Sequence, residues 1–170
     1  MTIKYQTDYF SVCTSADGDD YLASSGDEVL IVPLTPDGDV LLTLEPAPAF
    51  NELVLVLPGG EVSPGEPHAE AANRELQEEI GYRAGRLDFL GELRPWSKYL
   101  AVRSHLFLAR DLTPSWLAGD EDYEIGVQRV PLDRFETLIA SGRLTDARVI
   151  AALYLARDYA ANSNAGTQTG

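Results

Sequence analysis

The sequence predicts a mixed α/β sandwich in a single domain, and three observations lead to this prediction. Short apolar runs rich in β-branched residues, separated by turn residues, fill roughly the first sixty positions, as in a sheet built of hairpins. A segment with helical periodicity follows at residues 67–80, and two more lie at 132–139 and 146–159. Because strands and helices do not alternate one by one, we expect a sandwich rather than a regular parallel βαβ series.

The composition is that of a globular protein. The 170 residues suffice for one hydrophobic core and are few for two, so we expect one domain at residues 1–161 and a disordered tail at 162–170. No apolar run approaches the roughly 18 residues that a membrane-spanning helix needs. The N-terminal residues lack the basic flank and apolar stretch of a secretory signal. We therefore predict a cytoplasmic protein with no membrane partner.

The charge limits the kinds of ligand. The formal net charge is −14, which would repel a polyphosphate backbone, so general nucleic-acid binding is disfavoured. A small phosphorylated ligand stays compatible, because a divalent cation reverses the sign of the field locally. The single cysteine, Cys13, cannot form an internal disulfide, and nothing near it in sequence indicates an activated thiol.

Five strands are expected before residue 58, in a meander of hairpins. Their ranges are 5–12, 20–24, 28–35, 40–45 and 53–57. Between the third and the fourth, Pro36, Asp37 and Gly38 form a strong turn signal, since proline fixes one φ and glycine accepts a positive one. We therefore predict a hairpin across residues 28–45.

The later elements follow from start and stop signals. The helix at 67–80 is expected to begin at Pro67 and to end before Gly81. Strands are expected near 87–94, 101–109 and 127–130, the last after an acidic segment at 119–124. The two C-terminal helices complete the domain.

Three carboxylates, those of Glu75, Glu78 and Glu79, share one sector of the first helix at 100° per residue. The adjoining sector is apolar and is expected to pack on the sheet; it consists of Ala69, Ala72, Leu76 and Ile80. Arg74 is four residues from both Glu70 and Glu78 and offsets part of the repulsion. Hard oxygen ligands in this arrangement suit Mg²⁺ or Mn²⁺. Alone, however, such a run is more typical of a solvated helix face.

The wider context favours the metal interpretation. The segment from Gly60 to Tyr82 resembles the complete Nudix box, in which a glycine, a glutamate, an Arg-Glu pair with an aliphatic residue, a Glu-Glu pair and a second glycine follow at fixed spacings. The positions that fit are Gly60, Glu66, Arg74, Glu75, Leu76, Glu78, Glu79 and Gly81. Tyr82 departs from the pattern, since an aliphatic residue is usual there.

This resemblance implies an α/β/α sandwich with a mixed sheet, in which the box forms a loop, a helix and a loop. It implies that Glu75 and Glu79 bind Mg²⁺, with Mn²⁺ as a substitute, that Glu78 is a further ligand, and that the carbonyl of Gly59 completes part of the shell. The reaction implied is the attack of water on a phosphorus of a nucleoside diphosphate compound.

The resemblance also implies catalytic roles outside the metal shell. Glu66 and Arg74 resemble the orienting pair of the family. In the ADP-ribose pyrophosphatase branch the base that activates water lies on an acidic loop downstream of the box, and residues 120–124 stand there in this chain. Glu121 is the first candidate for the base and Glu124 the second, with a box glutamate as the remaining alternative. An exposed charged turn is the non-catalytic interpretation of the run.

A narrower similarity is to the ADP compounds hydrolases, which act on ADP-ribose, diadenosine polyphosphates and NADH and release AMP. The segments that carry it are residues 70–76, 107–114, 119–121 and 146–148. Two features depart from it: the N-terminal region is short, and Leu44, Glu45 and Pro46 replace the Arg-Glu pair usual after that strand.

A loop of aromatic and basic residues is the candidate for substrate binding, by stacking on adenine and holding a phosphate or ribose. Its residues are Arg94, Trp96, Lys98, Tyr99 and Arg103. Packing of the aromatic rings in the core explains the same residues equally well. His68 and His105 are interpreted as surface or packing residues rather than catalysts, and Trp116 as a core residue.

The function predicted is that of an ADP-ribose or ADP-compound pyrophosphatase, with a homodimer as the expected assembly. A MutT-like nucleoside triphosphate pyrophosphatase is the nearest alternative. A non-catalytic sensor of nucleotide sugars is a third hypothesis, which the intact Glu75, Glu78 and Glu79 disfavour, since a sensor has no need of metal-binding acids.

Overall fold

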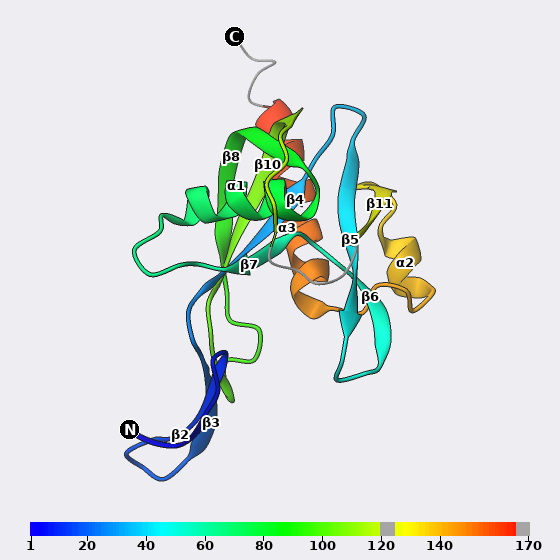
Figure 1. Ribbon diagram of the computed structural model, residues 1–170. Coiled ribbons are helices and arrows are strands. Elements are labelled where there is room, and N and C mark those ends of the chain that lie inside the picture. The colour runs from blue at the N-terminus through cyan, green and yellow to red at the C-terminus, as the bar shows by residue number, and fades with distance from the viewer. Residues whose placement is uncertain (120–124, 166–170) are drawn as a thin grey trace.

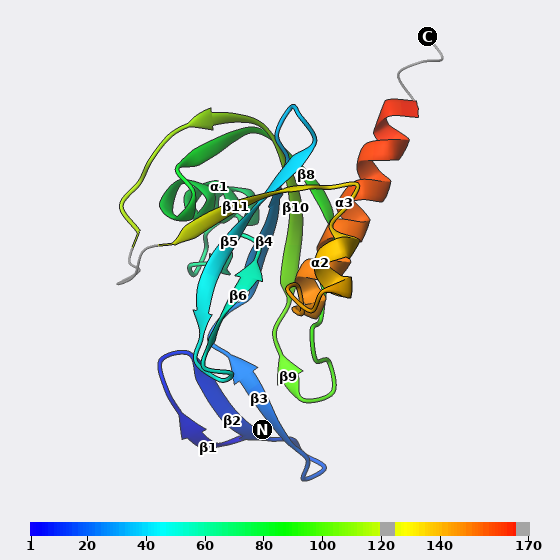
Figure 2. The same cartoon turned by 90° about the vertical axis from the view of Figure 1, so that its right-hand side faces the viewer.

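The computed structural model describes residues 1–119 and 125–165, and side chains as far as Ser163. The body has three layers, with helix α1 on one side of the strands and helices α2 and α3 on the other, as Figures 1 and 2 show. The helices are α1 (His68–Glu79), α2 (Glu136–Ala140) and α3 (Ala147–Ala165). The predicted α/β/α sandwich is thus confirmed. No helix among the described residues is long and apolar enough to cross a membrane.

Two sheets form the middle layer. The first has the order β7-β4-β10-β8 and is mixed, because β4 and β10 are parallel while the other pairs are antiparallel. Its strands are β4 (Glu28–Pro33), β7 (Gly59–Glu61), β8 (Tyr82–Leu93) and β10 (Ser104–Pro114). The second is antiparallel, with the order β11-β5-β6. Its strands are β5 (Asp39–Ala47), β6 (Glu52–Val56) and β11 (Gly126–Pro131).

Strand β4 contributes to both cores because its side chains alternate across the sheet. Leu30 and Val32 belong to the cluster formed with α2 and α3, whereas Val29 and Ile31 belong to the cluster under α1. All four residues are buried. A strand covered on both faces should be apolar throughout, which is why residues 29–32 show no polar alternation.

The hairpin predicted across Pro36, Asp37 and Gly38 is confirmed. Gly38 has a φ of 85°, and its N–H donates to the carbonyl of Thr35 over 3.0 Å. Positive φ costs glycine little, so the turn closes without strain. The hairpin brings β4 and β5 into neighbouring positions in the two sheets.

A further sheet at the N-terminus, with the order β1-β2-β3-β9, projects from the body (Figures 1 and 2). Its strands are β1 (Thr2–Gln6), β2 (Phe10–Thr14), β3 (Asp20–Ser24) and β9 (Leu100–Ala101). The single strand predicted at 5–12 is wrong, since the chain turns between β1 and β2. The Thr7 hydroxyl accepts the N–H of Phe10 over 2.9 Å and stabilises this turn without glycine or proline.

Two predictions for the C-terminal part need correction. The helix expected at 132–139 begins only at Glu136, because the N–H of Leu132 donates to the carbonyl of Gly38 and holds the chain in a turn. Helix α3 continues to Ala165, so the tail expected to be disordered from residue 162 is helical in its first part. Residues 166–170 lie outside the described part of the chain.

Candidate active site

Helix α1 is held between two fixed ends. At its start, Pro67 is extended, and its carbonyl accepts the N–H groups of Glu70 and Ala71. At its end, Gly81 has a φ of 71°, and a Cβ there would lie 2.3 Å from the ring of Trp116. Trp116 is 70% exposed and its ring lies against this glycine, so its prediction as a core residue is wrong. Glycine therefore both ends the helix and admits the ring.

The apolar face of α1 is shifted relative to the prediction. Ala72, Leu76 and Ile80 are buried as expected, but Ala71 rather than Ala69 completes the face. Ala69, in the first turn of the helix, is exposed. The carboxylate sector therefore lies beside the buried face.

Two carboxylates of that sector are buried. Glu75 is 8% exposed and Glu79 is 5% exposed, whereas Glu78 is only partly covered. The backbone N–H of Gly59 points to the Glu79 carboxylate, at 3.3 and 3.5 Å from its two oxygens. Buried carboxylates are costly unless they are paired with cations or hydrogen-bond donors. Their burial excludes a solvated helix face as the explanation of this sector.

Arg74 connects the carboxylates of the site. Its Nε and Nη2 donate to the two oxygens of Glu66 over 3.0 and 3.1 Å, in a bidentate pair. Its Nη1 donates to Glu75 over 2.7 Å and to Glu78 over 3.0 Å. The hydrogen bond from Arg74 lowers the pKa of Glu66, and the bond to Glu66 raises the pKa of Arg74. The pairing with Glu66 and Glu78 agrees with the prediction, whereas Glu70 is exposed and is not among the ion-pair partners of Arg74 in the described part of the chain.

The two glycines before the helix let β7 approach the carboxylates closely. A Cβ on Gly60 would lie 2.4 Å from a Glu75 carboxylate oxygen, and one on Gly59 would lie 2.2 Å from the carbonyl oxygen of Val29. Gly59 meets backbone atoms and therefore requires glycine, whereas a Cβ on Gly60 would displace the Glu75 carboxylate from its position. Backbone and carboxylate oxygens of the strand and the helix thus share one small volume.

The donors of this volume fit a hard divalent cation. Among the described residues, the hydrogen-bonded cluster contains the carboxylates of Glu66, Glu75 and Glu78 but only one cationic side chain, Arg74. Glu79 adds a further buried carboxylate beside Gly59. Surplus negative charge with oxygen donors suits Mg²⁺. The residues that would hold it are those predicted: Gly59, Glu75, Glu78 and Glu79.

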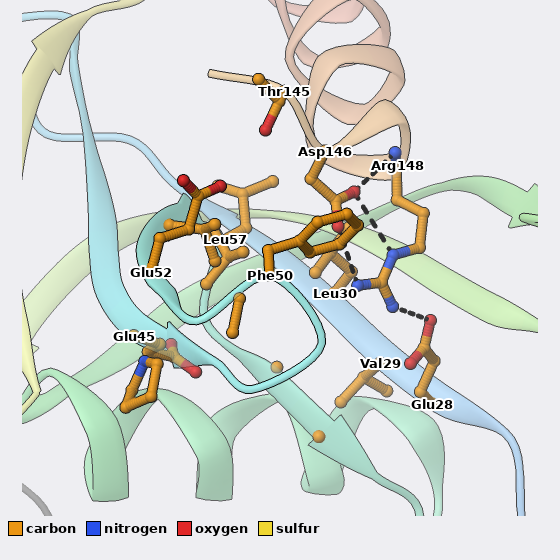
Figure 3. Close-up of a pocket in the computed structure, with 16 residues that line it drawn as sticks. Glu28, Val29, Leu30, Glu45, Phe50, Glu52, Leu57, Thr145, Asp146 and Arg148 are labelled. Atoms are coloured by element: carbon orange, nitrogen blue, oxygen red, sulfur yellow. Dashed lines mark hydrogen bonds and ion pairs between the residues drawn. The ribbon is translucent and has the colours of Figure 1, made fainter. Parts of the chain in front are cut away.

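A cavity of about 630 Å³ lies beside these glycines (Figure 3). It is lined by residues 28–30, by part of the segment 45–60, and by Thr145, Asp146 and Arg148. Phe50, on the loop between β5 and β6, is 76% exposed and faces the cavity, as does Arg148 at the start of α3. Among the described residues, the lining contains one basic side chain, Arg148, and four acidic ones. The acidic residues are Glu28, Glu45, Glu52 and Asp146.

Arg148 is fixed at the cavity wall by two ion pairs. Its Nη1 donates to Glu28 over 2.8 Å and its Nη2 to Asp146 over 3.0 Å. Burial tends to lower the pKa of Arg148, but the bond to Asp146 and the charge of Glu28 outweigh it, and the pKa is raised. The sequence prediction missed Arg148 and Phe50 as site residues. The one sequence signal for Arg148 is that residues 146–148 are among the segments that resemble the ADP compounds hydrolases.

The structure separates the residues expected to bind substrate. Trp96 lines a second cavity of about 600 Å³, which shares Phe50 and Arg148 with the first. Tyr99 packs edge-on against Trp96 at 5.5 Å, and Lys98 lies over the Tyr99 ring. The two arginines of the set contact acids instead: Arg94 pairs with Glu92, and Arg103 with Asp27 and Glu92. Of the five residues, only Trp96 lines a cavity with Arg148.

The expected bases, Glu121 and Glu124, lie outside the described residues. The chain leading to them is bound to the end of α1. The N–H of Ser115 donates to the carbonyl of Gly81 over 2.9 Å, and that of Leu117 donates to the carbonyl of Gln77 over 3.2 Å. Residues 115–117 therefore run beside the helix that carries the carboxylates.

Comparisons with known proteins agree with this geometry. The family model described as NUDIX domain matches residues 25–153. The ADP compounds hydrolase NudE of Escherichia coli K12 is 36% identical over 77% of this chain and 70% of its own. The ADP-ribose pyrophosphatase of Bacillus subtilis 168 is 26% identical over 74% of this chain and 69% of its own.

A solved structure supports the same assignment. The crystal structure of an ADP compounds hydrolase superposes with a TM-score of 0.83 at 30% identity, over 95% of this chain and 92% of that one. Sequence and fold therefore agree along nearly the whole length. The chain belongs to the Nudix family and is a Nudix pyrophosphohydrolase.

Proposed function

We propose that the protein hydrolyses the pyrophosphate bond of ADP compounds, with ADP-ribose as the main substrate, in an Mg²⁺-dependent reaction that releases AMP. The observation that carries this proposal is the position of the cavity, which extends from Gly59 and Gly60 at the carboxylate cluster to the exposed ring of Phe50. A substrate with its diphosphate at the glycines would place its nucleobase near the Phe50 ring. The names of the relatives in Escherichia coli and Bacillus subtilis support this substrate class.

The wall of the cavity favours ADP-ribose over a nucleoside triphosphate. The Phe50 ring offers a stacking surface for adenine. Carboxylates such as Glu45 and Glu52 accept hydrogen bonds from an exocyclic amine or from ribose hydroxyls. These carboxylates also repel a third phosphate. Arg148, the one basic side chain in the described lining, is already paired with two acids. The second cavity, at Trp96, has room for the group beyond the diphosphate.

The mechanism divides between the cation and the protein. Mg²⁺, when bound, neutralises charge on the diphosphate oxygens. Arg74 holds Glu75 and Glu78 close together, and Glu66 fixes the orientation of Arg74. The Gly59 N–H restrains Glu79. These contacts preorganise the oxygen donors before substrate arrives.

A base must accept the proton of the attacking water. We assign this role to Glu121, with Glu124 second and a box glutamate third. The hydrogen bonds of Ser115 and Leu117 support a base from the segment that follows them, since they hold the preceding chain beside α1.

A substrate panel tests the proposal. The purified protein is incubated with ADP-ribose, NADH, a diadenosine polyphosphate and nucleoside triphosphates, each with Mg²⁺, and both products are identified. We expect AMP and ribose 5-phosphate from ADP-ribose, with loss of turnover on chelation and recovery on adding Mg²⁺ or Mn²⁺. Preferential release of inorganic pyrophosphate from triphosphates would instead establish the MutT-like alternative, and binding of ADP-ribose without turnover would establish a sensor.

A further inference from the structure

Both histidines of the 170-residue chain meet at one place, away from the carboxylate cluster. The rings of His68 and His105 are stacked, with centroids 3.7 Å apart and an interplanar angle of 21°. The Nε2 of His105 lies 3.4 Å from a carboxylate oxygen of Asp27. The three side chains place their possible ligand atoms within 4.8 Å of one another. His68 lies within the box segment but is not one of its fixed positions, and the two cavities described above include none of the three residues.

Three separate elements bring the side chains together. His68 is the first residue of α1, His105 lies on β10, and Asp27 immediately precedes β4. His105 is paired with Val29 in the parallel ladder, so its side chain is on the α1 face of the sheet and is buried there. The carbonyl of Asp27 accepts the N–H of Val62 over 2.9 Å, which fixes the segment before β4. The cluster is thus positioned by the fold.

We propose that Asp27, His68 and His105 form a binding site for a transition metal, with Zn²⁺ as the expected ion. Two imidazole nitrogens and one carboxylate oxygen are a donor set that Zn²⁺ accepts, with water as a fourth ligand. Mg²⁺ prefers oxygen donors, so the two kinds of site should select different ions. The partial exposure of Asp27 leaves access for the ion and its water.

Binding requires a small rearrangement. Bonds of about 2.0 Å place the ligand atoms of a tetrahedral zinc site about 3.3 Å apart, so the cluster must contract and the stacked rings must tilt. His68 can make this movement, because it lies at the helix terminus and its ring is not enclosed in the core. His105 is buried and stays in place. The ion would join α1, β10 and the start of β4 at one point.

Nearby charges set the affinity of this site for the ion, and its distance from Glu75 separates it from the box carboxylates. Arg103 lies 3.7 Å from the same Asp27 oxygen and competes with the ion for the carboxylate, although its side chain is half exposed. The net charge of −14 favours the ion at longer range. Glu75 is seven residues beyond His68 on α1, which corresponds to about 10 Å along the helix axis. An ion here would therefore not share ligands with the box.

The experiment uses the untagged full-length protein in excess Mg²⁺, because an affinity tag of histidines would itself bind Zn²⁺. Calorimetric titration with Zn²⁺ should give one site, and His68→Ala should weaken it at least about tenfold. His105→Gln should do the same. Arg103→Gln should bind Zn²⁺ more tightly than the wild type, since the competing cation is removed; a cluster that only packs would not show this gain.

A second measurement does not depend on any variant. In the wild type, Zn²⁺ should shift the ring resonances of both histidines in a nitrogen-detected NMR spectrum, at one equivalent. Unshifted rings, or binding that persists in His68→Ala and disappears in Glu79→Gln, would overturn the proposal by placing the ion at the box. Neither readout uses turnover, so failure of the proposed hydrolysis would leave this test intact.

Discussion

At the scale of single residues, Arg74 determines the geometry of the site. One guanidinium bonds Glu66, Glu75 and Glu78, and a lysine could not reproduce these directed contacts. Helical spacing alone predicted the contact with Glu78, which is four residues away. The contact with Glu66 depends on the loop before the helix, so it came from the resemblance and not from periodicity.

We predict that Glu79→Gln removes most turnover and leaves the fold intact. The change keeps the size of the side chain and its acceptor for the Gly59 N–H, but it removes the charge that binds the cation. Steady-state kinetics at saturating Mg²⁺, together with circular dichroism, check both parts. Near-wild-type activity would contradict the assignment of Glu79 as a metal ligand.

We predict that Glu121→Gln lowers kcat by roughly 10² to 10⁴, the range for loss of a general base, with little change in metal affinity. Glu124→Gln is the matched control and should have a much smaller effect. Kinetics with ADP-ribose on both variants decide between the two. A large loss at Glu124 alone would reverse the assignment, and no loss at either would transfer the role to a box glutamate.

At the scale of elements, local signals predicted the structure where they were strong. The turn at Gly38 and the α1 helix were predictable because proline, glycine and periodicity agree there. The turn between β1 and β2 was not, since it depends on a hydroxyl of Thr7. Arg148 was missed for another reason: its partner Glu28 is far away in sequence, and only packing of α3 on the sheet joins them.

The start of α3 provides a prediction at this scale. The Asp146 carboxylate accepts the N–H groups of Arg148 and Val149 over 2.8 and 3.2 Å and also pairs with the Arg148 side chain. Burial tends to raise the pKa of Asp146, but the bonds from Arg148 outweigh it and the pKa is lowered. The stabilisation is therefore present above the unfolded pKa of about 3.9 and is lost as the pH falls through the folded value.

Asp146→Asn should accordingly destabilise the protein by about 1 to 2 kcal/mol at pH 7, because asparagine still caps the helix but cannot pair with the arginine. The difference from the wild type should shrink as the pH falls below about 3.9. Urea unfolding at several pH values measures it. A difference independent of pH would show that the charge of Asp146 contributes nothing.

At the scale of the whole molecule, a layered body and a projecting sheet are joined in one chain. The layers were predictable, because buried strands and amphipathic helices must cover one another. The position of the projecting sheet was not, since nothing local in its strands specifies where it lies. Exposed apolar side chains are frequent on it, including Ile3, Tyr5, Tyr9 and Phe10.

We predict a homodimer that buries part of this sheet, because apolar groups of this size are seldom left in water in a monomer. Light scattering at micromolar concentration should give twice the mass of the chain, and Tyr5→Asp should shift the population towards the monomer. A monomeric wild type with full activity would refute the prediction.

The projecting sheet and the body of the molecule should also differ in their stability against local unfolding. Neither hydrophobic cluster of the body contains a residue before Val29, all residues of β1 are exposed, and Cys13 is the one buried residue of β1, β2 and β3. The projecting sheet can therefore unfold locally while the layers of the body stay folded. Amide protons of residues 2–24 should exchange with deuterium far faster than those of β4 and β10, so that the protein behaves as two cooperative units, one that opens readily and one that opens only on global unfolding.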